Sequence, residues 1–342
     1  MIKVPEIKEL DRSFVTSAKQ RLASLAIPEG ALGQLGELAI ELMTFTKSTK
    51  PDFCSRRLFL CAADHGIASQ GVSKYPQVSS GIVSCAQRGG AVINALCRAN
   101  DCDLTIVDSG LLREVDGVKD LCVRRGGTRD FSIDAAMTET ECRMALEKGV
   151  ELGLEAQEDL ILLGEIGIGN TSSAAAIFAK IFNLNAREIT GAGTGVQEAQ
   201  LEKKISLIQQ ALNRVDLTGL EGENRAFEIM RQLGGYELAM LSGICLGAAS
   251  QGKLVVLDGF LSASAALLAI ELNPLLKDYL LGSHLGAEQG HRLQVEKLGI
   301  KTYLDLGLRL GEGSGAVLML NLIDSACAIL ESTMTLDEVL NA

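Results

Sequence analysis

The stretch Leu58-Phe59-Leu60-Cys61-Ala62-Ala63-Asp64-His65-Gly66 is an apolar run that ends on an acid, a histidine and a glycine. Three later runs have the same form: residues 104–107 before Asp108, 160–163 before Gly164 and Glu165, and 254–257 before Asp258. Runs that do not alternate with polar residues predict strands buried on both faces, and the segments between them have helical patterns. The sequence therefore predicts an α/β fold with a parallel sheet covered on both sides.

The acids that end these runs predict where a ligand would bind. Ligands of parallel sheets bind beyond the carboxyl ends of the strands. Asp64, Asp108, Glu165 and Asp258 would lie at that edge, so we expect the functional site there. The chain of 342 residues suits one large domain, or a major and a minor lobe.

Helical patterns occupy both ends of the chain. Residues 1–50 predict two helices, Phe14 to Leu25 and Gly33 to Phe45, and an apolar run after Gly315 predicts a third that reaches Leu330. We expect these helices to form a smaller lobe from both termini. The chain would then consist of a helical arm (1–50), an α/β domain (51–305) and a C-terminal part with a glycine-rich turn and the last helices (306–342).

The segments between the strands predict helices that cover the sheet. Gly89 to Ala99, Ser172 to Phe182 and Tyr236 to Ala249 are rich in small and apolar residues, which permits close packing. The segment Val215 to Glu228 is polar and contains two glycines. We expect it to be a long surface loop.

Composition narrows the class of function. The net charge of -11, the absence of tryptophan and the 4% aromatic content disfavour a nucleic-acid groove. No uninterrupted apolar run reaches the roughly 20 residues of a membrane span, and the N-terminus lacks the form of a signal peptide. Nine cysteines without a Cys-x-x-Cys pair predict reduced, mostly buried thiols. We expect a soluble, cytoplasmic protein that binds a small molecule.

The turn Leu308-Arg309-Leu310-Gly311-Glu312-Gly313-Ser314-Gly315-Ala316 predicts a functional site. One carboxylate stands among three glycines that let a ligand approach the backbone, and an apolar helix begins directly behind it. Glu312 would then be a general base, and the amides of residues 313–315 would face an anionic or ribosyl group. The alternative is an ordinary glycine-rich turn with a solvated acid.

The segment Gly164-Glu165-Ile166-Gly167-Ile168-Gly169-Asn170-Thr171-Ser172 predicts a phosphate site. It follows a strand and opens an alanine-rich helix, whose free amides and positive dipole end suit an anion. The Lys-Ser/Thr pair of a P-loop is missing, and the segment is no clean dinucleotide fingerprint. A capped turn without a ligand is the alternative.

Weaker signals lie elsewhere in the chain. The glycine-rich turn 191–195 precedes Lys204, which could pair with a phosphate, although such lysines are usually solvated. Tyr75 lies in an extended loop before Pro76 and could line the slot of a planar ligand. His284, Glu288 and His291 have a spacing that could place three metal ligands on one helix face, but two glycines weaken that helix. No nucleophile motif is present.

Taken together, these stretches resemble the nicotinate-nucleotide:dimethylbenzimidazole phosphoribosyltransferases, the family that makes the lower-ligand nucleotide of cobalamin. The similar stretches run along nearly the whole chain: residues 20–22, 28–33, 63–66, 71–73, 75–77, 88–91, 164–171, 234–237, 257–260, 283–284, 287–288 and 309–315. So many matches in order are more specific than any single glycine loop.

The resemblance implies a Rossmann-like, doubly wound parallel sheet with a smaller helical lobe, and a dimer whose active sites lie near the subunit interface. It implies phosphoribosyl transfer from nicotinate mononucleotide to an aromatic base, without metal or other cofactor. Glu312 matches the general base, and Glu165 matches a second acid near the donor. Positions that match the donor site are Gly167, Gly169, Asn170, Thr171, Gly193, Lys204, Gly313, Ser314 and Gly315. Positions that match the acceptor pocket are Tyr75, Val83, Ile166 and Leu310.

Some residues depart from the family pattern. Gln34 replaces a common arginine, the loop after Tyr75 lacks an acid that is often present, and Val83 stands where some members have glutamine. A less polar pocket would favour purine or phenolic acceptors over a benzimidazole. Relatives that use phenols pair two different homologous subunits, so the partner subunit is either identical or homologous.

Two other functions compete with this one. A non-catalytic subunit of a heteromer would have no need of the base, so the presence of Glu312 speaks against it. A nucleotide-dependent oxidoreductase is disfavoured because the chain lacks a Gly-x-Gly-x-x-Gly fingerprint between a strand and a helix.

Overall fold

A six-stranded sheet forms the centre of the protein. The computed structural model describes residues 4–191 and 198–342. All pairings are parallel, and the strand order is β3-β2-β1-β4-β5-β6. The strands are β1 (Arg56–Ala63), β2 (Asp103–Gly110), β3 (Lys119–Asp120), β4 (Leu160–Ile166), β5 (Leu254–Leu257) and β6 (Leu280–Gly282). This order is that of the Rossmann fold, so the prediction of a doubly wound α/β protein is confirmed.

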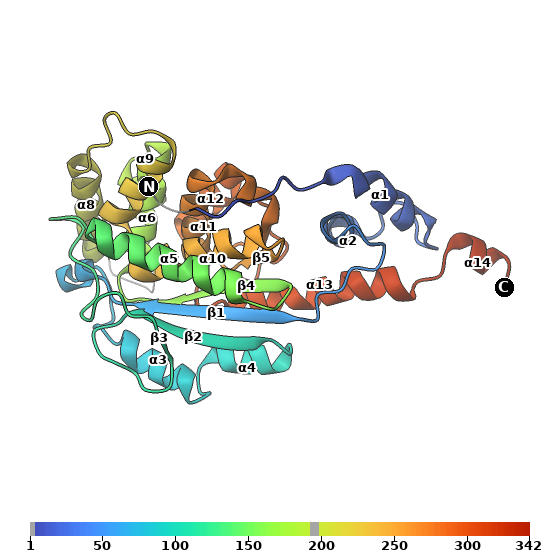
Figure 1. The fold of residues 1–342 in the computed structure, drawn as a ribbon, viewed down its shortest axis with the longest axis horizontal. Helices are drawn as coiled ribbons and strands as arrows, with labels where there is room; N and C mark the ends of the chain where they lie inside the picture. Colours follow the sequence, from blue (N-terminus) through green and yellow to red (C-terminus); the bar gives the residue numbers. More distant parts are fainter. Residues whose placement is uncertain (1–3, 192–197) are drawn as a thin grey trace.

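Helices cover both faces of the sheet (Figure 1). They are α1 (Val15–Ser24), α2 (Gly33–Thr46), α3 (Ser79–Gln87), α4 (Val92–Ala99), α5 (Glu139–Glu155), α6 (Asn170–Phe182), α7 (Ala186–Ile189), α8 (Glu198–Arg214), α9 (Gly222–Leu233), α10 (Tyr236–Ser250), α11 (Phe260–Leu272), α12 (Gln289–Leu298), α13 (Ser314–Ser332) and α14 (Leu336–Leu340). Short 3-10 helices span Arg12–Phe14, Gly66–Gln70 and Pro274–Tyr279.

The side chains of β1 show why the strands are apolar throughout. Leu58, Leu60 and Ala62 pack into one hydrophobic cluster together with α2, α4 and α13. Phe59, Cys61 and other alternate residues pack into a second cluster with α5, α6, α10 and α11. Successive side chains of a strand point to opposite faces, so a strand between two helical layers is buried at every position.

The two ends of the chain meet in a helical lobe, drawn in dark blue and red in Figure 1. Helix α2 packs against α1 and α13. The amide of Ala26 donates to the carbonyl of Met334 at 2.9 Å, and the Arg21 guanidinium donates to the carbonyl of Leu330 at 2.9 Å. Helix α13 is long and apolar enough to cross a membrane by length and composition alone, but half of it is buried inside the protein, as in a core helix.

The expectation of a long surface loop from Val215 to Glu228 is wrong. Helix α9 begins at Gly222 and continues to Leu233, so that only residues 215–221 form the connection. Ala226, Phe227 and further apolar residues with helical spacing are buried along one side of α9. The expected loop ended inside this amphipathic pattern, and the polar residues that suggested a loop belong to the outer face of the helix.

Helices α5 and α10 approach each other closely because glycines line their contact. A β-carbon at Gly149 would collide with the carbonyl of Met240, and one at Gly243 would collide with the carbonyl of Leu146. Gly247 is equally confined, facing the carbonyl of Val150. The backbone of α10 can therefore lie against α5 while its other sides contact β1, β4 and α11.

Candidate active site

Four acids lie at the carboxyl ends of the strands, as the sequence predicts, and all four are buried. Two of them accept hydrogen bonds from other groups of the protein. Asp64 accepts the Leu112 N–H at 2.8 Å and the Ser79 hydroxyl at 2.6 Å, and Asp108 accepts the Leu111 N–H at 2.9 Å. Glu165 and Asp258, at the ends of β4 and β5, line a cavity instead. The site therefore lies at the half of the sheet edge formed by β4 and β5.

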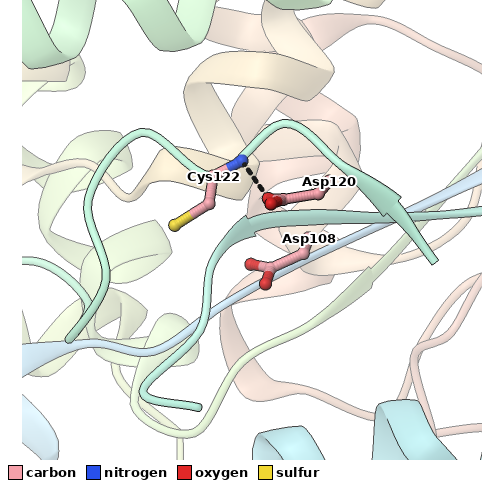
Figure 2. Close-up of side chains that lie close together, drawn as sticks. All are labelled: Asp108, Asp120 and Cys122. Atoms are coloured by element: carbon pink, nitrogen blue, oxygen red, sulfur yellow. Dashed lines mark hydrogen bonds between the residues drawn. The ribbon is translucent and has the colours of Figure 1, made fainter. Parts of the chain in front are cut away.

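Asp108 also belongs to a group with Asp120 and Cys122 whose potential ligand atoms lie within 4.8 Å of one another (Figure 2). The Arg125 guanidinium pairs with Asp108 and lies 3.7 Å from Asp120. Burial raises the pKa of the Cys122 thiol, which opposes its use as a ligand. Because Arg125 already pairs with Asp108 and lies beside Asp120, the group is explained as an ion-pair cluster.

The cavity has a volume of about 520 Å³, within the range of small-molecule sites. It lies between the ends of β4 and β5, the loop of Tyr75, and the turn before α13. Residues of the predicted site that line it are Tyr75, Glu165, Ile166, Gly167, Asn170, Thr171, Leu310 and Glu312. Val78 and Ile82 also line the cavity and were not indicated by the sequence, and so do Phe260 and His284, to which the sequence gave no role in binding donor or acceptor. The glycine turn at 308–316 and the loop at 164–172, far apart in sequence, thus meet at one cavity.

Glu312 lies on a sharp turn between Gly311 and Gly313. All three residues have positive φ, and the value of 62° for Glu312 is in the left-handed region, where a side chain costs about 1 kcal/mol. Its Oε2 is buried without a hydrogen-bond partner among the described residues. Burial raises the pKa of Glu312, and the backbone of Ile93 partly opposes this effect. An acid with a raised pKa and a free oxygen is suited to accept a proton from a ligand.

Glu165 is 8% exposed at the end of β4. The Asn170 side chain donates a hydrogen bond to it. Burial, followed by the nearby charges of Asp258 and Glu237, raises the pKa of Glu165 well above its usual value, although the Asn170 hydrogen bond opposes this. A cationic ligand beside Glu165 would favour the ionised carboxylate.

Asp258 binds backbone amides that we expected to face an anionic or ribosyl ligand. Its carboxylate accepts the N–H groups of Gly313 at 3.1 Å, Gly315 at 2.7 Å and Ala316 at 3.3 Å. The Ser314 hydroxyl donates to the carbonyl of Gly311 at 2.7 Å. The expectation that the amides of residues 313–315 face a ligand therefore needs correction, because a protein carboxylate fills the N-terminus of α13. Burial raises the pKa of Asp258 to about 7 despite these hydrogen bonds.

The first turn of α6 lines the cavity through Asn170 and Thr171, and the buried Lys204 contacts Thr171. Gly169 precedes α6 with a φ of 100°, and a β-carbon there would press against His65 and Ile67. Lys204 of α8 is 2% exposed, and its ammonium donates to Thr171 Oγ1 at 3.0 Å and to the Gly191 carbonyl at 3.3 Å. Burial lowers the pKa of Lys204 to about 8. A helix N-terminus beside a buried lysine suits a phosphate.

Some predicted site residues lie elsewhere. Val83 is fully buried in the hydrophobic core and does not line the cavity, whereas its neighbour Ile82 does. Gly193 lies outside the described residues. His284 and Glu288 line the cavity but precede α12, so the helix face that could have held a metal together with His291 does not exist. His291 Nδ1 accepts the Gly286 N–H at 2.8 Å, and burial lowers the pKa of His291 to about 3.

A family model described as phosphoribosyltransferase matches residues 7–339, and this match gives the class of the protein. The nicotinate-nucleotide–dimethylbenzimidazole phosphoribosyltransferase of Bradyrhizobium diazoefficiens is 41% identical over 332 residues, which cover 96% of this chain and 93% of the relative. The protein of the same name from Chlorobaculum parvum is 38% identical over 337 residues, covering 96% and 94%. The crystal structure of CobT from Thermus thermophilus matches with a TM-score of 0.89 and 38% identity, covering 95% of this chain and 98% of that one. The chain belongs to the nicotinate-nucleotide–dimethylbenzimidazole phosphoribosyltransferase family.

Proposed function

We propose that the cavity transfers the phosphoribosyl group of nicotinate mononucleotide to an aromatic acceptor, a dimethylbenzimidazole-like base, a purine or a phenol. The products would be nicotinate and an α-ribotide for cobamide biosynthesis. The observation that carries this proposal is the buried, unpartnered carboxylate oxygen of Glu312 in the same cavity as the first turn of α6. A proton acceptor and an anion site in one apolar cavity are what the transfer requires.

The donor would lie across the first turn of α6. Lys204, with the turn of Gly167, Gly169, Asn170 and Thr171, offers a positive environment for the phosphate. Gly193 would belong to the same side of the site, as the family resemblance implies. The three residues 313–315 would contribute by holding Glu312 in place, since their amides and hydroxyl bind protein groups.

The acceptor would lie between apolar side chains beside Glu312. Ile166 at the end of β4 and Leu310 before the Glu312 turn line the cavity, and Tyr75 and Leu310 are half exposed at 49% and 48%. Ile82 and Val78 extend the same surface. A flat aromatic ring could be held there by apolar contact. Val83 is buried and would support the side chains that line the cavity.

The reaction would proceed as a single displacement. The acceptor loses an N–H or O–H proton to Glu312 while its nucleophilic nitrogen or oxygen forms a bond to the anomeric carbon, and the bond from that carbon to the nicotinate nitrogen breaks. Nicotinate leaves from a cationic ring and takes the bonding electron pair, so its departure needs no strong acid. Glu165 in its ionised form would stabilise the positive charge that develops on the sugar. Attack opposite the leaving group inverts the anomeric carbon and gives the α-linked product.

Glu312→Gln tests the role of the base. We expect kcat to fall about 100-fold or more, because the amide cannot accept the proton, while the affinity for nicotinate mononucleotide stays within about threefold. Steady-state nicotinate release and a direct binding measurement supply the two values. Glu202→Gln is the matched control, since Glu202 is exposed and pairs with Arg187 outside the cavity. Near-wild-type turnover of Glu312→Gln would refute the role of Glu312.

We further propose that the protein acts in the cytoplasm as a dimer, with an identical or a homologous subunit. The resemblance implies an interface near the active site. A second candidate contact lies on and beside α14, at the far end of the helical lobe in Figure 1, where apolar side chains are exposed. They are Met334, Leu336, Val339 and Leu340. A purely non-catalytic subunit is not favoured, because Glu312, Glu165 and Lys204 are all in place. No step of this proposal calls for a metal or other cofactor.

A further inference from the structure

We propose that Asp258 is a positioning residue for Glu312: its carboxylate holds the first turn of α13 and thereby fixes the direction of the Glu312 side chain. This inference rests on the proposed role of Glu312 as the base. Asp258 lies at the end of β5, and Glu312 belongs to a turn more than fifty residues later. The sheet and the catalytic turn are thus joined at this carboxylate.

The hydrogen bonds of Asp258 satisfy the start of α13. A helix leaves its first N–H groups without partners inside the helix. Gly313, the N-cap residue of α13, has no side chain to accept them. Asp258 Oδ2 accepts the Gly313 N–H at 3.1 Å, and Oδ1 accepts those of Gly315 at 2.7 Å and Ala316 at 3.3 Å. One carboxylate thus caps the helix from another part of the chain.

The peptide between Glu312 and Gly313 is held on both sides. Its N–H group points to Asp258, and its carbonyl oxygen faces Gly164 of β4, where a β-carbon would lie 2.6 Å away. This peptide sets the backbone of Glu312, which already has the left-handed φ of 62°. With the peptide fixed between two strands of the sheet, the Glu312 carboxyl group has a fixed starting direction into the cavity.

Contacts with neighbouring residues hold Asp258 in place, and the groups that it binds favour a carboxylate over an amide. The Ser283 hydroxyl donates to the Asp258 carbonyl at 3.0 Å, and His284 Nδ1 lies 3.7 Å from Oδ1. Among the described residues, no lysine or arginine lies within ion-pair distance of Asp258. In its ionised form Asp258 therefore meets the positive end of the α13 dipole and three amides. An asparagine would offer one oxygen and would turn an amine toward one of these N–H groups.

A double-mutant cycle tests the inference. Asp258→Asn is made in the wild-type protein and in Glu312→Gln, and nicotinate release is measured with nicotinate mononucleotide and dimethylbenzimidazole. If Asp258 acts through Glu312, we expect Asp258→Asn to lower kcat about 10-fold or more in the wild type, with KM for the donor within about threefold. In the Glu312→Gln background, the same substitution should lower kcat by no more than about twofold. Equal losses in both backgrounds, or an unchanged kcat in the wild type, would overturn the inference.

The cycle also separates this inference from the proposed function. Wild-type turnover of Glu312→Gln would refute the base, whereas a slow Glu312→Gln with additive losses would refute only the positioning role. Asp108→Asn is the control for the loss of a buried carboxylate at a strand end: Asp108 also accepts a backbone N–H, but it pairs with Arg125 and does not line the cavity. We expect its kcat to stay within about twofold of the wild type. If Asp258→Asn does not fold, Asp258→Glu is used in the same cycle with the same expected results. This substitution displaces the carboxylate by one methylene.

Discussion

Lys204 combines a charged group with an almost fully buried position. Its described hydrogen-bond partners, Thr171 and Gly191, are neutral oxygens. Burial holds its pKa at about 8 in place of 10.5. The folded protein therefore binds this proton less tightly than the unfolded chain does, and at neutral pH the charge destabilises the fold by about 3 kcal/mol at roughly 1.4 kcal/mol per pKa unit. The proposed role of Lys204 in binding a phosphate would account for such a cost.

Replacing Lys204 should therefore stabilise the protein and weaken donor binding. At pH 7 we expect Lys204→Met to raise the free energy of unfolding by about 2 kcal/mol, the lost hydrogen bonds offsetting part of the gain. This gain should shrink as the pH rises from about 8 toward 10.5, where the unfolded lysine also loses its proton. Urea unfolding at several pH values measures it. The affinity for nicotinate mononucleotide should fall about 10-fold or more.

The neighbouring residue supplies the control for this substitution. Lys203 is exposed on the same turn of α8, so Lys203→Met should change neither stability nor donor affinity appreciably. An unchanged free energy of unfolding for Lys204→Met, or the same increase for Lys203→Met, would contradict the account of a buried, destabilising charge.

At the scale of elements, the contact between α5 and α10 depends on glycine. Gly243→Ala would place a methyl group against the carbonyl of Leu146 and the amide of Val150. We expect it to lower the free energy of unfolding by about 2 kcal/mol, because the helices must separate. Gly81→Ala in α3 is the matched control, since nothing lies within 4 Å of the added carbon and φ is not positive. Its helix should gain up to about 1 kcal/mol. Equal effects in urea unfolding would contradict the packing argument.

The elements also show what the sequence can and cannot predict. Four apolar runs predicted β1, β2, β4 and β5, because strands buried on both faces carry an unbroken apolar signal. The strands β3 and β6 have only two and three residues, too few for any periodic pattern. The sequence of α9 resembles a loop over residues 215–228 because polar residues of its outer face dominate that window, which ends inside the helix. For α9, the missing information is which face of the helix packs against the rest of the protein.

At the scale of the whole molecule, the strand order explains why two distant turns form one site. The chain moves from β1 outward to β3 and then returns to β4 on the other side of β1. Ligands of such sheets bind near this reversal. The loop after β4 supplies Glu165 and the start of α6, and the turn before α13 brings Glu312 to the same cavity.

The residues of the candidate site also divide into those that local sequence indicates and those that it does not. Glu312 and the glycines after β4 could be identified from local sequence, because a carboxylate among glycines and a glycine-rich helix start are local signals. The burial of Lys204 and the capping role of Asp258 could not, since both depend on residues distant in sequence. The placement of Val83 behind Ile82 depends on the rotation of α3, which a single residue type does not reveal.

The acidic character of the cavity fits the proposed donor as a whole. Under the proposal, Glu165 and Glu312 line the space that would receive the cationic ring. Lys204, which contacts Thr171, would lie toward the phosphate. Such a separation of charge matches a ligand with a cationic ring at one end and an anionic phosphate at the other. After transfer, nicotinate leaves as an anion with an uncharged pyridine ring, and this attraction is lost.

The most direct test is the release of nicotinate when the purified protein is mixed with nicotinate mononucleotide and, in turn, dimethylbenzimidazole, adenine or phenol. The account predicts release that depends on at least one of these acceptors, forms the matching α-ribotide, and falls about 100-fold or more in Glu312→Gln. No release with any of the three acceptors, or release at the same rate without an acceptor, would contradict it.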